Sequence, residues 1–127
     1  MNARNIGYWT STALVAFSFL SGGVLYLLGV EAPVKGVMEL GYPAYFVTFL
    51  GFWKLAGGLA ILLPRLPRVK EWAYAGIAFD LIGAAYSLVA AGHGAGSTIA
   101  PLVVLGIAAA SWALRPAGRR LESAAAA

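Results

Sequence analysis

Residues 51–83 read GFWKLAGGLAILLPRLPRVKEWAYAGIAFDLIG, and two charges within this stretch decide how the chain folds. Lys54 and Asp80 each lie near the middle of an apolar segment of about twenty residues, which is the length that spans a bilayer as a helix. Lys54 precedes Pro64 by ten residues, and Asp80 follows Lys70 by ten residues. If the segment between Pro64 and Lys70 is a turn, antiparallel helices carry both charges to one depth, about 15 Å into a hydrocarbon core about 30 Å thick.

The depth of these two charges predicts that they interact. An ionised side chain at the centre of a membrane helix costs about 2.5 to 3.5 kcal/mol on insertion scales. Two unpaired charges would therefore oppose insertion of both helices. We expect Lys54 and Asp80 to contact each other directly or through one water molecule.

The composition places the whole chain in a membrane. Of its 127 residues 61% are hydrophobic and 11% are charged, and the mean hydropathy is +0.79, whereas about a quarter of the residues are charged in soluble domains. The sequence predicts an all-α membrane protein, an antiparallel bundle of four transmembrane helices in one domain over residues 1–120, followed by a disordered tail at 121–127. The predicted helices cover residues 8–30, 44–63, 72–91 and 98–114.

The positive charges predict the orientation of the bundle. Seven of the nine basic residues fall on the side that the two termini share with the connection between the second and third helices. Because Lys and Arg accumulate in cytoplasmic loops, we expect both termini in the cytoplasm and the protein in the cytoplasmic (inner) membrane of a bacterium. The formal net charge of +4 then serves topology and attraction to anionic lipids, and no nucleic-acid partner is expected.

Small residues recur beside both charges. On the second predicted helix Gly51 and Gly58 flank Lys54, and on the third Gly76 and Gly83 flank Asp80, at offsets of three and four residues. Such stripes let helix backbones approach closely, so we expect them to face the bundle interior. The first helix carries a comparable stripe, with a tyrosine hydroxyl on the same side, formed by Ser11, Ser18, Gly22, Tyr26 and Gly29.

The chain lacks the residues of several common sites. It contains no cysteine, so neither thiol–disulfide chemistry nor a thiolate metal site can form within it. His93 is the only histidine. Together with Glu31 and Glu39 it could form an external metal site, but a single histidine in a glycine loop is more often a solvated spacer, and we expect no metal and no cofactor held by the chain.

The order and spacing of several motifs resemble the DoxX-like family of small bacterial membrane proteins with four helices. The matching stretches are 39–46 (ELGYPAYF), 51–58 (GFWKLAGG), 70–76 (KEWAYAG), 79–84 (FDLIGA) and 111–116 (SWALRP). The resemblance implies a four-helix membrane fold, and the family name comes from relatives that are subunits of a thiosulfate:quinone oxidoreductase. Where the family often has Ser-His at the outer end of the third helix, this chain has Ser87-Leu88.

Three functions are compatible with this sequence. In the first, the chain is a structural or accessory subunit of a membrane complex, such as a quinone-linked oxidoreductase, or forms a homo-oligomer. In the second, the bundle binds or acts on a lipophilic ligand such as a quinone or lipid, with Lys54 as hydrogen-bond or proton donor and Asp80 as counter-ion or base. The third is a proton-coupled small transporter. The residues expected to line a ligand site are Tyr26, Glu39, Tyr42, Tyr45, Trp53 and Ser87.

Overall fold

The computed structural model describes residues 2–64 and 66–116, and these residues form five helices. Four of them are long and apolar enough to cross a membrane. The predicted fold class, a bundle of transmembrane helices, is therefore confirmed. The helices are α1 (Ala3–Leu28), α2 (Glu31–Glu39), α3 (Ala44–Leu62), α4 (Pro67–Ala90) and α5 (Ala95–Ala113).

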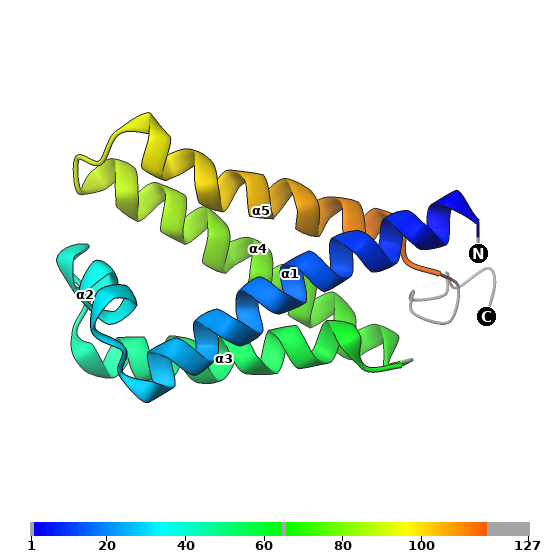
Figure 1. Cartoon of the computed structure of the whole chain (residues 1–127), viewed down its shortest axis with the longest axis horizontal. Coiled ribbons are helices and arrows are strands. Elements are labelled where there is room, and N and C mark those ends of the chain that lie inside the picture. The colour runs from blue at the N-terminus through cyan, green and yellow to red at the C-terminus, as the bar shows by residue number, and fades with distance from the viewer. Residues whose placement is uncertain (1, 65, 117–127) are drawn as a thin grey trace.

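The four long helices do not pack evenly around one axis. Helix α1 crosses the bundle obliquely and contacts both α3 and α5, whereas α4 and α5 run side by side as an antiparallel pair (Figure 1). Helices α3 and α4 approach each other near their connection and diverge toward the opposite end of the molecule (Figure 1). The start of α1, the α3–α4 connection and the end of α5 share one end of the bundle, which we call the basic end.

Three helices begin earlier than predicted: α1, α4 and α5, the last at Ala95 rather than Thr98. Helix α1 begins at Ala3 rather than Tyr8, because the side chain of Asn2 caps it by accepting a hydrogen bond of 2.9 Å from the Asn5 amide. Helix α4 begins at Pro67 rather than Trp72. Pro67 suits the first turn of α4, because proline has no N–H to lose there and its fixed φ matches the helix.

A short helix, α2, occupies the connection between α1 and α3. It covers Glu31–Glu39, and Glu31 in its first turn places a negative charge at the positive end of the helix dipole. None of its residues is buried. It lies at the end of the molecule where α3 and α4 have diverged (Figure 1).

Glycine sets the closest helix approach, between α1 and α3. A Cβ atom on Gly23 would lie 2.9 Å from the carbonyl oxygen of Gly51, and one on Gly58 would lie 2.9 Å from two carbon atoms of Leu20. These distances leave no room for a side chain. The expected close approach at Gly51 and Gly58 is therefore present: Gly51 faces Gly23 on α1, and Gly58 faces Leu20.

The stripe expected on the third predicted helix does not face the interior. Gly76 and Gly83 are exposed, and a Cβ atom on either would meet nothing within 4 Å. The buried face of α4 instead carries large side chains, among them Tyr74, Ile77 and Leu81. On α1 the predicted Ser18 and Gly29 are exposed as well. Helix α4 therefore packs into the core through large side chains and makes no close glycine contact of the kind seen between α1 and α3.

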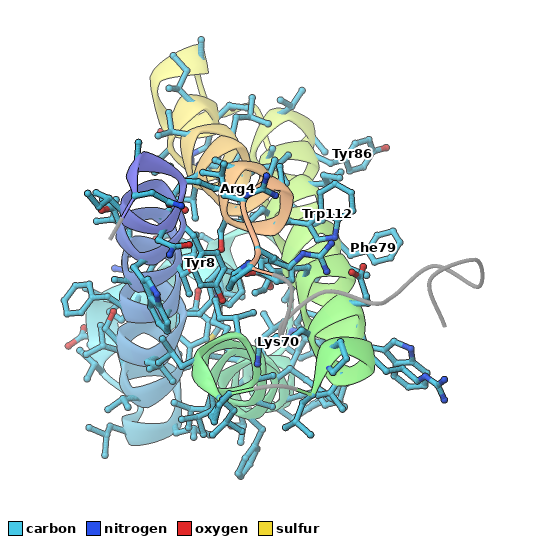
Figure 2. All side chains as sticks on the ribbon, turned by 90° about the vertical axis from the view of Figure 1, so that its right-hand side faces the viewer. Arg4, Tyr8, Lys70, Phe79, Tyr86 and Trp112 are labelled. Atoms are coloured by element: carbon cyan, nitrogen blue, oxygen red, sulfur yellow. The ribbon has the colours of Figure 1, made fainter. Side chains whose placement is uncertain are left out.

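Figure 2, seen from the basic end, separates inward from outward side chains. Tyr8 and Lys70 point into the bundle, and both are fully buried. Phe79 and Tyr86 project outward from α4 and are about three-quarters exposed. In a helix long and apolar enough to span a membrane, such side chains face the hydrocarbon of the bilayer. The apolar core between the helices includes Val15, Phe19, Ile61, Ile77 and Leu81.

Candidate functional site: an ion pair beside an apolar groove

Lys54 of α3 and Asp80 of α4 meet across the widening gap between their helices. Lys54 Nζ donates a hydrogen bond of 3.0 Å to Asp80 Oδ2, so the predicted direct contact is present. The ammonium group also lies 4.3 Å from the ring centroid of Phe19 and 5.7 Å from that of Tyr26, both on α1. Cation–π attraction from these rings adds to the ion pair. The site therefore joins three helices.

The pair is only partly enclosed by protein. The Lys54 side chain is 16% exposed and that of Asp80 is 21% exposed. Because the attraction between two charges is stronger where water is excluded, this partial burial strengthens the ion pair. Part of each side chain nevertheless remains accessible. An ammonium has three N–H donors, and the bond to Asp80 uses one of them.

An apolar groove of about 470 Å³ adjoins the pair. It runs between α3 and α4, and its walls include the aromatic side chains of Phe19, Phe49, Trp53 and Trp72. Lys54 and Asp80 are the charged members of this lining among the described residues. A groove of this volume with an apolar wall and a small polar centre has the character of a small-molecule site.

Of the expected ligand-site residues, two form a separate link near the other end of the bundle. The hydroxyl of Tyr42 and that of Ser87 lie 2.6 Å apart, joining the connection before α3 to the end of α4. Tyr42 also stacks on Phe46, with ring centroids 4.8 Å apart. These contacts tie α3 to α4 where the two helices have diverged.

The remaining expected residues are scattered. Trp53 lines the groove but is 62% exposed, and Tyr26 faces Lys54 from α1. Glu39 is exposed on α2, and Tyr45 is exposed at the start of α3. Neither of these two belongs to the groove lining. Their roles in binding stay predictions, and the structure does not bring them to the ion pair.

Lys70 was interpreted from the sequence as one of the basic residues of a turn, and that placement was wrong. Its side chain is fully buried, and Nζ donates to the carbonyl oxygens of Ala60, at 2.8 Å, and Leu63. Residues 64 and 67 are prolines, so neither carbonyl can receive an amide hydrogen four residues later in the chain. The Lys70 ammonium supplies those missing donors at the end of α3.

Two further polar clusters near the basic end escaped the sequence analysis. The Ser111 hydroxyl lies 2.6 Å from that of Thr12 and 2.7 Å from that of Tyr74, which links α1, α4 and α5 in the interior. Arg115, also buried, pairs with Glu71 at the start of α4. Ser111 and Arg115 lie in the quoted motif 111–116, but nothing in that motif indicates partners that are 37 to 99 residues away in the sequence.

The external metal site considered for His93 has no support in the geometry. His93 is exposed, and over residues 2–64 and 66–116 no three His, Cys, Asp or Glu side chains gather where they could hold a metal ion.

The comparisons with known proteins agree with this architecture. A family model described as the DoxX-like family matches residues 10–111, from the first turns of α1 to the last turn of α5. The matched region contains Lys54, Asp80 and the whole groove. Searches of curated proteins and of solved structures gave no match.

Proposed function

The chain belongs to the DoxX-like family, and from that premise we propose that it is a multi-pass membrane protein that binds a small lipophilic molecule in the groove between α3 and α4. The observation that carries this proposal is the placement of the Lys54–Asp80 pair in the wall of a groove that is otherwise apolar. A ligand in such a groove gains from apolar burial and is oriented by few polar contacts.

The chemistry of the pair favours a ligand with an oxygen acceptor, such as a quinone carbonyl. Lys54 would donate a further N–H to that oxygen, while Asp80 stabilises the ammonium as its counter-ion. Phe19 and Tyr26 would hold the ammonium from the side of α1. Since the chain has no cysteine and no dinucleotide or phosphate-binding motif, electron transfer to such a ligand would require a partner protein.

The test is a thermal-unfolding screen of the purified full chain in detergent against quinones and other lipophilic compounds. A ligand at 100 times its Kd stabilises the folded protein by about 2.7 kcal/mol. We expect at least one quinone-type compound to raise the Tm of the parent protein, and the increase to be lost in Asp80→Asn, which keeps the shape of the side chain but removes its charge.

A groove-filling variant separates binding from folding. Ala56 is exposed and lines the groove, whereas Ala13 is exposed on α1 and does not line it. We expect Ala56→Phe to fold and lose the ligand-induced rise in Tm, and Ala13→Phe to keep it. If no compound stabilises the parent protein, or if Ala56→Phe responds as Ala13→Phe does, the groove is not a ligand site.

The second candidate is an accessory subunit of a membrane complex, in which the ion pair only fixes α3 against α4. The hydrogen bond of 3.0 Å favours it, because the two charges already satisfy each other. In that case Asp80→Asn leaves Lys54 without its counter-charge and destabilises the parent fold, while no lipophilic compound changes the Tm.

A further inference from the structure

One oxygen of the Asp80 carboxylate receives no hydrogen bond from the protein. Oδ2 accepts the bond from Lys54 Nζ, whereas Oδ1 accepts none from residues 2–64 and 66–116. Every buried side-chain nitrogen or oxygen of these residues has a hydrogen-bond partner, so Oδ1 is not sealed inside the protein. Because Asp80 lines the groove between α3 and α4, a molecule in that groove can reach this oxygen.

A second carboxylate, that of Glu71, shows the opposite situation. It belongs to the lining of another groove, of about 280 Å³, between α4 and α5. Arg115 pairs with its Oε1, and Trp112 Nε1 donates a hydrogen bond of 3.1 Å to its Oε2. Both oxygens of Glu71 are therefore bonded within the protein, and Asp80 Oδ1 is the acceptor that remains for a ligand.

The depth and the neighbours of Asp80 define the donor that suits Oδ1. Asp80 lies near the middle of α4, where the hydrocarbon core supplies no water to donate to it. A ligand that donates to this charged oxygen therefore gains more than one that lacks a donor. The donor has to be uncharged, because the Lys54 ammonium, 3.0 Å from Oδ2, would repel a second cation.

Lys54 adds a second requirement. Its ammonium has N–H groups besides the one bonded to Asp80, so the pair offers a donor and an acceptor side by side. A hydroxyl group matches both, since its O–H donates and its oxygen accepts. A carbonyl or an ether oxygen only accepts, and a carboxylate would be repelled by Asp80.

We propose that the groove between α3 and α4 selects a neutral lipophilic phenol, whose hydroxyl donates to Asp80 Oδ1 and accepts from Lys54 Nζ. This inference rests on the function proposed above and names the ligand class for that site. The aromatic ring would pack among Phe49 and Trp53 in the groove wall.

The lining also sets the direction of the ligand. On α4 it runs from Val69, near the basic end, to Asp80, a distance of about 16 Å along the helix. Asp80 is thus the α4 lining residue furthest from the basic end. A phenol would place its hydroxyl at the ion pair and extend an alkyl chain past Trp72 toward the basic end.

The test compares four compounds that share one benzene ring and one alkyl chain and differ in the polar group: a phenol, its methyl ether, a benzoate and a benzylamine. Their Kd values for the purified full chain in detergent are measured by calorimetric titration. We expect the phenol to bind at least about tenfold more tightly than the ether, because the ether lacks the donor. The benzoate and the benzylamine should bind more weakly still. For the same reason a hydroquinone should bind more tightly than its quinone.

The groove-filling variants show whether this preference arises at the ion pair. Ala56→Phe should abolish the preference for the phenol, and Ala13→Phe, outside the groove, should keep it. A preference that survives in Ala56→Phe would place the phenol elsewhere and overturn the inference.

Failure of this inference differs from failure of the proposed function. If the ether binds as tightly as the phenol, or if the benzoate or benzylamine binds most tightly, the hydroxyl does not bridge the pair, yet the groove remains a ligand site. The same holds if none of the four binds while a quinone raises the Tm. If no compound of any kind binds, the proposed function fails together with the inference.

Discussion

At the scale of single residues, two lysines perform different tasks in this protein. Lys54 pairs with a carboxylate beside an apolar groove, whereas Lys70 binds two backbone carbonyls at the end of α3. The difference follows from the neighbouring sequence. Lys54 stands amid apolar residues that offer it no acceptor, while Pro64 and Pro67 deprive the carbonyls near Lys70 of their amide donors.

Lys70 provides the first prediction at this scale. Lys70→Met keeps the length of the side chain but removes the donor, so the Ala60 and Leu63 carbonyls lose a charged partner. Hydrogen bonds to charged groups contribute about 1.5 to 3 kcal/mol each, and we expect a loss of at least this size in the free energy of unfolding. Unfolding in mixed detergent micelles measures it.

Arg68 is the matched control, because it lies two residues away and is exposed. Arg68→Met should change the free energy of unfolding by less than about 0.5 kcal/mol. Similar losses in the two variants would show that the Lys70 ammonium contributes no more than a surface charge.

At the scale of the helices, α3 packs tightly on one neighbour and loosely on the other. Glycine backbones bring it against α1 at Gly23 and Gly51, while toward α4 it is held by the Lys54–Asp80 pair and, further along, by the Tyr42–Ser87 hydrogen bond. Directional polar contacts can bridge a gap that side chains do not fill. This combination leaves the groove open between α3 and α4.

The glycine contact predicts opposite effects for two glycine substitutions. A Cβ on Gly51 would lie 2.9 Å from Leu27 Cγ and 3.1 Å from the Gly23 carbonyl oxygen, whereas one on Gly83 would meet nothing within 4 Å. We expect Gly51→Ala to destabilise the protein by about 1 to 3 kcal/mol through overpacking. Gly83→Ala should stabilise it by about 0.5 to 1 kcal/mol through helix propensity.

Unfolding free energies of the two variants, measured under one detergent condition, check this prediction. A Gly51→Ala protein as stable as the parent would mean that α1 and α3 can separate at little cost. The glycines would then not determine their distance.

At the scale of the whole molecule, three chain segments that are distant in sequence meet at the basic end. The start of α1, the α3–α4 connection and the end of α5 lie together there (Figure 1). Arg4 donates a hydrogen bond of 3.4 Å to the Ala113 carbonyl, joining the first and last helices. The concentration of positive charge at this end predicts that it faces the cytoplasm.

Cysteine labelling tests this orientation without background, because the chain contains no cysteine of its own. We expect Val69→Cys, at the basic end, to be inaccessible to an impermeant thiol reagent in intact cells and to react after the membrane is permeabilised. Ser97→Cys, at the opposite end, should react in intact cells. The reverse pattern would turn the bundle over and place Glu31 and His93 in the cytoplasm.

The sequence by itself determined the membrane setting, the four spanning segments and the pairing of Lys54 with Asp80. Each follows from a local quantity: the length of an apolar run, or the cost of placing a charge at a given depth. Helix starts were predicted less well, since Asn2 and Pro67 act through capping and backbone geometry that hydropathy does not register.

Only the tertiary structure decided which face of each helix is buried, and therefore where the grooves lie. Gly76 and Gly83 form as regular a stripe as Gly51 and Gly58, yet they face outward. In a membrane both faces of a helix are apolar, so hydropathy cannot tell the lipid side from the protein side. The partners of Glu71 and Ser111 were not predicted, because both residues lie near the helix ends, where a charge or a hydroxyl has no depth cost of the kind that pointed Lys54 to Asp80.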